Sequence, residues 1–271
     1  MKYKAICSDI DGTLLNSIRD LSPRLVEAVN RLPEKFPVIL ASSRMPDAMR
    51  HLVTDLRRHS QPLIAYNGGF VLSSIGEILE DVSIPVALVE QILRLTERSK
   101  IHVSLYQGEN WYEEKDDYWS QREVKNTKVQ CTWMNGMDVV DLWSKGKSGA
   151  HKVMCMGNHD EINWLFGELN FEHGQDLHLY RSSDTYLEIA PKAISKATGL
   201  RKILAHEYEF EMESVIAFGD NYNDIDLLQS VGWGVAVDNA KPEVKAVAKE
   251  ITLHHKEDGV AAVLEKLLLQ V

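Results

Sequence analysis

Hydrophobic residues alternate along the chain between short continuous runs and patterns with helical spacing. Residues 3–10, 36–42 and 61–69 contain apolar runs that predict buried strands. Residues 23–32 and 46–59, which lie between these runs, have helical apolar spacing, and each begins with a proline, a favoured residue of the first helical turn. Buried strands that alternate with helices predict a mostly parallel sheet with helices on both faces.

The same alternation returns near the C-terminus. The predicted order there is helix, strand, helix, strand and two helices, over residues 197–208, 214–220, 223–231, 232–239, 242–251 and 259–271. Both ends of the chain thus predict elements of one architecture. We expect an α/β fold in which a Rossmann-like, parallel-sheet core domain is built from both ends of the chain.

The middle of the chain has longer segments and a different pattern. Its predicted elements are two amphipathic helices and three strands, at residues 86–99 and 160–171, and at residues 102–107, 151–156 and 177–182. We predict an inserted α+β cap domain over residues 82–187. The core domain would then consist of residues 1–81 and 188–271.

Composition narrows the class of protein. The 271 residues suit two domains or one large one, and 44% hydrophobic with 26% charged residues is ordinary for a globular protein. The net charge is -10 and no run of basic residues stands out, so we expect no nucleic-acid partner. We also expect no membrane association and a cytoplasmic location, because no signal-peptide pattern and no apolar stretch of about 20 residues is present. Three widely spaced cysteines agree with a reducing compartment.

Polar side chains follow four of the predicted strands at the point where each strand ends. In chain order they are Asp9, Ile10 and Asp11, then Ser42, Ser43 and Arg44, then Asn67 and Gly68, and finally Asp220, Asn223 and Asp224. Any one of these groups could be only a helix cap. In open parallel α/β sheets, however, ligands bind beyond the carboxyl ends of the strands, so four such groups indicate one site.

The residue types at these strand ends suggest a particular chemistry. Clustered carboxylates repel one another, and a divalent cation removes that conflict. An all-oxygen ligand set suits Mg²⁺. Serine hydroxyls and backbone N–H groups at a helix start suit a bound phosphate. Together they indicate metal-assisted phosphoryl transfer with a carboxylate available as nucleophile.

Four segments resemble the motifs of the haloacid dehalogenase superfamily, in the order and spacing of that family. "DIDGTLL" resembles its first motif, DxDGTL, and "VILASSR" resembles its second, an apolar strand that ends in Thr or Ser. "EIAPKAISKATGL" resembles the segment with the third motif, a lysine, and "GDNYNDIDLL" resembles the fourth, GDxxND. The resemblance covers essentially the whole chain, and the long insert is similar to the large cap of the Cof-type branch.

The resemblance implies roles for the residues at the strand ends. Asp9 would be the nucleophile that forms an aspartyl-phosphate, and also a ligand of Mg²⁺. Asp11 would protonate the leaving oxygen and later activate water, while its backbone carbonyl binds the metal. Lys196 would bridge Asp9 and the phosphate, and Asp220 would ligate the metal. The remaining residues would hold phosphate, substrate or the metal and its waters, namely Ile10, Ser42, the Ser43 N–H, Arg44, Asn67, Gly68, Asn223 and Asp224.

Some positions leave alternatives open. Lys192 lies close to Lys196, and we prefer Lys196 because Ser195 before it resembles a helix cap. Arg44 could instead form an ion pair on a helix surface. The family usually has Gly where Ser43 and Ala197 stand. We expect Glu113–Asp117 to be a solvated turn.

The function that the resemblance implies is hydrolysis of small phosphate monoesters, sugar phosphates or related metabolites, by a Mg²⁺-dependent phosphatase. Its partner would be a small phosphorylated metabolite. A phosphomutase with the same Asp nucleophile is an alternative. A further alternative is a non-catalytic phosphoacceptor or binding module, but a silent module would be expected to have lost some of the motif carboxylates, and none is lost.

Overall fold

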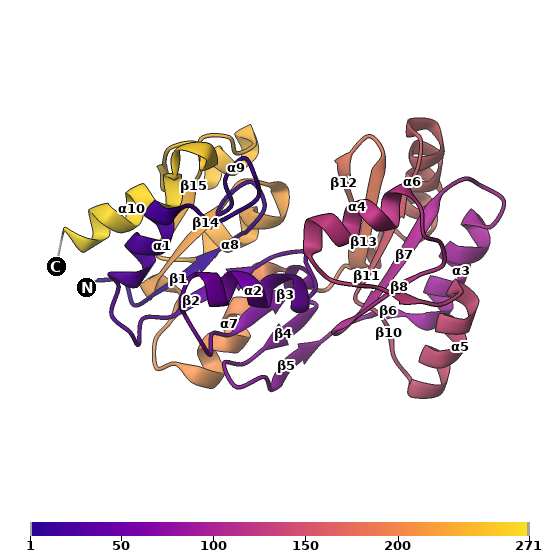
Figure 1. Ribbon diagram of the computed structural model, residues 1–271, viewed down its shortest axis with the longest axis horizontal. Helices are drawn as coiled ribbons and strands as arrows, with labels where there is room; N and C mark the ends of the chain where they lie inside the picture. Colours follow the sequence, from indigo (N-terminus) through magenta and orange to yellow (C-terminus); the bar gives the residue numbers. More distant parts are fainter. Residues whose placement is uncertain (1, 270–271) are drawn as a thin grey trace. The chain divides into compact units, whose positions relative to one another are not determined.

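The computed structural model describes residues 2–269 and divides the chain into two compact units (Figure 1). The first, here called the core unit, contains Met1–Glu80 and Ser195–Val271. The second, the cap unit, contains Asp81–Ile194. In the described part of the chain, no helix is both long and apolar enough to cross a membrane.

An eight-stranded sheet forms the centre of the core unit, in the order β16-β15-β14-β1-β2-β3-β4-β5. Its strands are β1 (Ala5–Ser8), β2 (Val38–Ala41), β3 (Leu63–Ala65), β4 (Phe70–Leu72), β5 (Ile78–Asp81), β14 (Val215–Gly219), β15 (Trp233–Ala236) and β16 (Glu250–Ile251). The strands from β16 to β3 pair in parallel, and β4 pairs antiparallel with β3. Strands of this kind are apolar on both faces, which explains their continuous hydrophobic runs.

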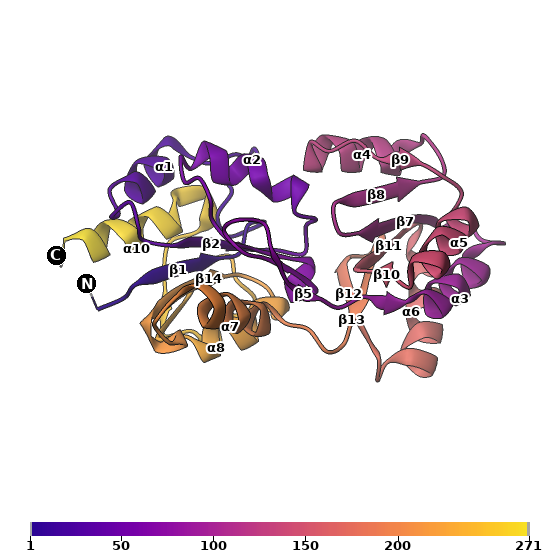
Figure 2. The same cartoon turned by 90° about the horizontal axis from the view of Figure 1, so that it is seen from below.

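Helices cover both faces of the core sheet. They are α1 (Pro23–Asn30), α2 (Asp47–Asp55), α7 (Lys196–Glu207), α8 (Ile225–Ser230), α9 (Pro242–Val247) and α10 (Gly259–Leu268). Figure 2 shows α1 and α2 on one face and α7 and α8 on the other. The predicted α/β class with a parallel core sheet is therefore confirmed. The last two residues of the helix predicted over residues 259–271 lie outside the described residues.

One predicted helix of the core unit is wrong in its second half. Residues 242–251 were expected to be helical throughout, but α9 ends at Val247 and Ala248 is extended. Glu250 and Ile251 then pair in parallel with Val235 and Ala236 of β15. The open edge of β15 offers unpaired backbone groups, and pairing with them overrides the local helical pattern.

The cap unit has a six-stranded sheet in the order β12-β13-β11-β7-β8-β9 and a two-stranded sheet of β6 and β10. Its strands are β6 (Ile84–Pro85), β7 (His102–Gln107), β8 (Asn110–Glu113), β9 (Thr132–Trp133), β10 (Gly149–Ala150), β11 (Lys152–Met156), β12 (Leu177–Ser183) and β13 (Tyr186–Pro191). Its helices are α3 (Val86–Thr96), α4 (Tyr118–Thr127), α5 (Gly136–Gly146) and α6 (His159–His173). The larger sheet is antiparallel except for the parallel pair of β8 and β9.

One face of the cap sheet packs against helices. Leu105 and Val153 on the strands belong to the same buried cluster as Ile92 of α3 and Trp143 of α5. Figure 2 shows α3 and α5 side by side. Side chains of a strand alternate between faces, so Ser104, next to Leu105, belongs to the opposite, more polar face.

The inserted unit extends to Ile194, beyond the predicted end at Leu187. Strand β13 pairs with both β11 and β12, so the residues after Leu187 complete the cap sheet. The sequence "EIAP" had been grouped with the motif lysine that follows it. Nothing local in the sequence shows which sheet such a short apolar run will join.

Candidate active site

Acidic residues from two neighbouring strands form a cluster in the core unit. Asp9 follows β1, and Asp220 follows β14, which pairs with β1 in parallel. Asp224 ends the short 3₁₀ helix η3 (Tyr222–Asp224) that comes next. One carboxylate oxygen of each residue lies within 4.8 Å of the others, an arrangement that could hold a metal ion. The parallel register of β1 and β14 thus joins acids that are over 200 residues apart in the chain.

Asp9 is buried and has one oxygen without a protein partner. The residue is only 6% exposed. Its Oδ1 accepts a hydrogen bond from Lys196 Nζ at 2.6 Å, whereas its buried Oδ2 has no partner among the described residues. Burial, with Asp224 and Asp220 nearby, raises the pKa of Asp9 well above its usual range, although Lys196 opposes that rise. An unsatisfied buried carboxylate oxygen is costly, so this atom is suited to a ligand from outside the chain.

Lys196 is the cation of the cluster. It is the first residue of α7 and is fully buried, and its Nζ also donates to Asp224 Oδ1 at 2.7 Å. Ser195 caps the helix by accepting a hydrogen bond from the Thr198 N–H, which fixes the backbone from which Lys196 extends. Burial alone would lower the pKa of Lys196, but Asp224 and Asp9 raise it above its ordinary value. Lys196 is therefore charged at neutral pH.

Asp224 holds the surrounding loop together. Besides Lys196, it binds the backbone N–H groups of Asp220 at 2.9 Å and Asn221 at 3.0 Å through Oδ2. A side chain on Gly219 would collide with it, since a Cβ there would lie 2.4 Å from the Asp224 Cβ. This carboxylate thus fixes both the lysine and the backbone that carries Asp220.

Two residues of the first motif position the side chain of Asp220. Thr13 Oγ1 donates to Asp220 Oδ1 at 3.1 Å. Gly12 has a φ of +87°, and a Cβ on it would lie 2.6 Å from Asp220 Oδ2. Burial and the neighbouring Asp224 raise the pKa of Asp220 to about 6. We had not assigned roles to Gly12 and Thr13 from the sequence, although both stand in the quoted motif "DIDGTLL".

The cluster fits a divalent cation. Three carboxylates face one lysine, which leaves an excess of negative charge in a mostly buried site. All the donors are oxygens, the type that hard cations such as Mg²⁺ prefer. The unpartnered Asp9 Oδ2 supplies an available ligand atom. The raised pKa values of Asp9 and Asp220 express the same excess of negative charge, which a cation would relieve.

Asp11 belongs to a second group of side chains. Its carboxylate binds Arg44 through two parallel hydrogen bonds, Nε to Oδ2 and Nη2 to Oδ1, both of 2.7 Å. Arg19 Nη2 also donates to Asp11 Oδ1, at 2.7 Å. Burial raises the pKa of Asp11, but the hydrogen bonds and charge of Arg44, with Arg19, outweigh it and hold that pKa below the usual range. Arg44 is therefore a buried partner of Asp11 and not a cation on the helix surface.

The ends of β2 and β3 meet beside these groups. Ser42 is buried, its Oγ accepts the Arg44 N–H at 3.2 Å, and its carbonyl accepts the Asn67 N–H at 2.8 Å. Asn67 has a left-handed φ of 56°, and its Oδ1 accepts a hydrogen bond from Asn223 Nδ2 at 2.9 Å. The structure thus brings four of the predicted positions into one connected network.

Three further predicted residues lie in the same unit. Gly68 packs on the backbone before Lys196, because a Cβ on it would lie 2.2 Å from the Ser195 carbonyl oxygen. The Ile10 carbonyl accepts two backbone hydrogen bonds in the turn that follows, while its side chain is buried. Ser43 is half-buried between Ser42 and Arg44. Substrate roles for these residues stay predictions.

Lys192, the alternative motif lysine, lies in the cap unit. Its Nζ donates to the Gly174 carbonyl at 3.1 Å, and the side chain is exposed. Its backbone N–H binds the Asp176 carbonyl at 2.9 Å. The geometry thus agrees with the choice of Lys196, whose catalytic role stays a prediction.

The cap unit contains a buried polar network that the sequence did not suggest. Glu113 is fully buried and accepts hydrogen bonds from Ser104 Oγ at 2.5 Å and Trp111 Nε1 at 2.8 Å. His102 lies between two carboxylates, with Nε2 2.6 Å from Glu113 and Nδ1 2.9 Å from Asp117. Burial alone would lower the pKa of His102, but these two acids raise it. The expectation of a solvated turn over Glu113–Asp117 holds for the exposed residues 114–116 and is wrong for Glu113, because β8 carries Glu113 into the sheet.

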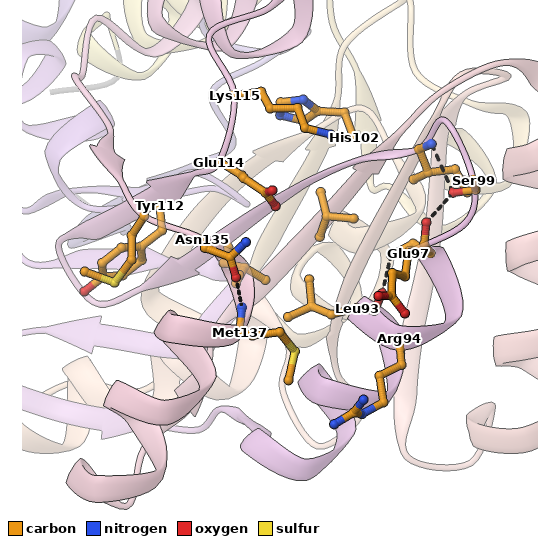
Figure 3. A pocket seen from close by; sticks show the side chains of 16 residues that line it. Leu93, Arg94, Glu97, Ser99, His102, Tyr112, Glu114, Lys115, Asn135 and Met137 are labelled. Atoms are coloured by element: carbon orange, nitrogen blue, oxygen red, sulfur yellow. Dashed lines mark hydrogen bonds between the residues drawn. The ribbon is translucent and has the colours of Figure 1, made fainter.

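A cavity of about 310 Å³ lies in the cap unit, and His102 of the polar network is one of the residues that line it. Figure 3 shows apolar side chains such as Leu93, Tyr112 and Met137 along it, together with the charged Glu114 and Lys115. None of the site residues predicted from the sequence lines it. The cavity and the acidic cluster of the core unit therefore share no residue.

Comparison with known proteins agrees with the geometry. Residues 6–264 match the family model of the haloacid dehalogenase-like hydrolases. A Haemophilus influenzae protein described as a candidate phosphatase is 32% identical over 98% of each chain. The 5-amino-6-(5-phospho-D-ribitylamino)uracil phosphatase of Bacillus subtilis is 26% identical over 96% of each chain. A haloacid dehalogenase-like hydrolase from Bacteroides thetaiotaomicron has a similar structure, with a TM-score of 0.88 and 29% identity over 98% of this chain and 99% of that one.

The match spans both the acidic cluster and the inserted cap, and the relatives named above cover 96–98% of the chain. The resemblance first drawn from four short motifs is thereby confirmed. This chain belongs to the haloacid dehalogenase-like hydrolases of the Cof-type branch, and it is a phosphatase that acts on phosphate monoesters.

Proposed function

We propose that this phosphatase depends on Mg²⁺ and hydrolyses small phosphate monoesters, sugar phosphates or related metabolites, through a phosphoryl group carried on Asp9. The observation that carries the proposal is the buried Asp9 Oδ2 without a partner, beside Asp220, Asp224 and the charged Lys196. The relative from Bacillus subtilis, named for a phosphorylated ribityl compound, supports the substrate class.

The carboxylates of Asp9, Asp220 and Asp224, with the backbone carbonyl of Asp11, would hold the cation. When bound, Mg²⁺ would offset negative charge on the carboxylates and on the phosphate. Lys196 opposes the rise in the pKa of Asp9 and would compensate the charge of an approaching phosphate. Fixed charges of this kind account for most of the catalysis of phosphoryl transfer.

The reaction then has two steps at phosphorus. An oxygen of Asp9 forms a bond to phosphorus while the bond to the leaving oxygen breaks, and Asp11 donates a proton to that oxygen. In the second step Asp11 takes a proton from water. The water oxygen bonds to phosphorus, the bond between phosphorus and Asp9 breaks, and inorganic phosphate is released.

The remaining strand-end residues would bind the phosphate oxygens. The Ser42 hydroxyl hydrogen and the Ser43 N–H are donors of the right type, and so is the Ile10 N–H, which donates to no acceptor among the described residues. Asn67 and Asn223 hold each other in place through their side chains. Phosphate and cation would thus be bound by separate parts of one preorganised site.

The proposal is tested by measuring phosphate release from a broad panel of phosphorylated metabolites, with Mg²⁺, after chelation and after Mg²⁺ is restored. We expect activity only with the metal, on several small substrates. Asp9→Asn should lose several orders of magnitude in turnover while keeping the fold, whereas Asp238→Asn, which removes an exposed surface carboxylate, should not. Full activity of Asp9→Asn would refute the covalent route. A need for a bisphosphorylated activator would instead indicate a phosphomutase.

A further inference from the structure

Two arginines share one carboxylate in the active site. Arg44 binds both oxygens of Asp11, and Arg19 binds Oδ1 of the same group. One negative charge thus faces two guanidinium groups. This local excess of positive charge contrasts with the acidic cluster around Asp9. It surrounds Asp11, the residue that would protonate the leaving oxygen.

Arg44 is fully engaged by the protein. Its fork contacts Asp11, its Nη1 donates to the Ala48 carbonyl at 3.2 Å, and its side chain is only 8% exposed. A bidentate pair of this kind fixes the orientation of the carboxylate. Arg44 therefore holds Asp11 in place and has little capacity left for a substrate.

Arg19 is placed differently. Its side chain is 51% exposed, and the contact of Nη2 with Asp11 is its one side-chain hydrogen bond among the described residues. Its remaining guanidinium N–H groups are therefore available to a ligand. Because Asp11 already has a bidentate partner, a second, exposed ion pair would add little stability.

Local hydrogen bonds nevertheless hold the backbone that carries Arg19. Asn16 Oδ1 accepts the N–H groups of Ile18 and Asp20, and the Asn16 carbonyl accepts the Arg19 N–H at 3.0 Å. This turn holds Arg19 at a φ of 61°, a left-handed conformation that is unfavourable for a residue with a side chain. The turn thus fixes the backbone beside Asp11 and leaves the guanidinium free to change partners.

We infer that Arg19 determines specificity by binding an anionic group on the leaving-group side of the substrate, so that the enzyme prefers phosphate esters with a carboxylate or a second phosphate close to the scissile phosphate. The inference rests on the proposed function, in which Asp11 contacts the leaving oxygen. An anion on an adjacent carbon of the leaving group would lie near the groups that surround Asp11. Arginine suits this task, since its planar fork binds carboxylate and phosphate alike.

Three substrates with one carbon skeleton test the inference. Glycerol 2-phosphate has no second anion, 2-phosphoglycerate has a carboxylate beside the ester carbon, and glycerol 1,2-bisphosphate has a second phosphate there. We expect the wild-type enzyme to have a higher kcat/KM on one or both anionic substrates. Arg19→Gln should lower the ratio of anionic to neutral kcat/KM about tenfold, mainly through KM, because a charge-assisted pair is lost. The same ratio in Arg19→Lys should lie between those of the wild type and of Arg19→Gln.

Arg24→Gln is the matched control. Arg24 is also a half-exposed arginine of the core unit. Its Nε and Nη2 donate to the two carboxylate oxygens of Glu265 at 2.9 and 2.7 Å. This variant should keep the wild-type ratio. An effect of Arg19→Gln on one anionic substrate alone would identify which anion is recognised.

Two outcomes separate the inference from the function on which it rests. Equal hydrolysis of the three substrates by the wild-type enzyme, or an unchanged ratio in Arg19→Gln, would overturn the role of Arg19 and leave the phosphatase proposal intact. Failure to hydrolyse these three substrates and every member of the metabolite panel would overturn both.

Discussion

At the scale of single residues, Lys196 explains how two carboxylates remain close together in a buried place. Its Nζ lies 2.6 Å from Asp9 and 2.7 Å from Asp224, and all three groups are buried. Removal of one partner from such a group leaves uncompensated charge. Lys196 therefore matters both for the site as it stands and for the phosphate that would enter it.

Lys196→Ala should lower turnover by about a hundredfold or more, because an approaching phosphate would then meet Asp9 without the lysine charge. Lys192→Ala should keep near wild-type turnover, since Lys192 contacts only a carbonyl of the cap unit through its side chain. The check is kcat for both variants, with circular dichroism to show that each is folded. Equal losses, or a larger loss for Lys192→Ala, would mean that the third motif has been aligned to the wrong lysine.

The site residues that the sequence revealed share one property. Asp9, Lys196 and Asp220 stand at strand or helix ends within recognisable motifs, so their meeting place follows from the sheet topology. Arg19 could not be predicted in this way. It lies in a turn outside the motif core, and its contact with Asp11 depends on a left-handed backbone that no local pattern announces.

At the scale of elements, the pair of strands β7 and β8 shows why some chemistry stays hidden in a sequence. The run Glu113–Asp117 is acidic, which is typical of a solvated turn. Pairing of Leu105 with Tyr112 brings Ser104 and His102 to Glu113 and converts a surface pattern into a buried network. The register between β7 and β8 determines which side chains meet Glu113, and a strand register is a property of the tertiary structure.

His102→Gln should destabilise the cap unit by about 3 kcal/mol, since Glu113 would remain buried without its charged partner. The wild-type contribution depends on pH. The folded-state pKa of His102 is raised above its ordinary value of 6.5, so the stabilisation is fully present below that value and is lost as pH rises through the folded-state pKa. The folded-state pKa of Asp117 is lowered, so the stabilisation that Asp117 contributes is lost only when pH falls below its ordinary pKa of about 3.8.

Thermal unfolding of both proteins between pH 5 and about 9 measures this effect. The difference between wild type and His102→Gln should be largest near pH 5 and should shrink towards alkaline pH. His206→Gln is the control, because His206 contacts Glu77 on the surface of the core unit. A difference that is constant across the range would show that His102 acts only through packing.

At the scale of the whole molecule, the core unit is assembled from the two ends of the chain, and the cap unit is inserted between them. The chain leaves the core unit after Glu80, at the end of β5, and returns at Ser195, directly before Lys196. This arrangement could be predicted, since both ends show the same strand–helix alternation. The end of the insert could not, because the sequence of β13 does not show which sheet the strand joins, and its membership is decided by pairing.

Replacement of residues 81–194 by a short linker should relax the selection for small substrates and lower the rate on them. The prediction rests on our proposal that the inserted unit limits access of large substrates and of bulk water to the phosphoryl-transfer step. Hydrolysis of a hexose phosphate, a phosphopeptide and a nucleic-acid end phosphate, measured side by side with and without the cap, checks this. A preference of the intact protein for either macromolecular substrate would contradict the account.

The central claim is that the phosphoryl group is carried on Asp9 between substrate and water. The most direct test is the stereochemical course at phosphorus, measured with a good substrate from the panel made chiral with oxygen isotopes. Two successive in-line displacements, first by Asp9 and then by water, predict overall retention of configuration. Inversion would show that water attacks the substrate directly, and it would contradict the role assigned to Asp9.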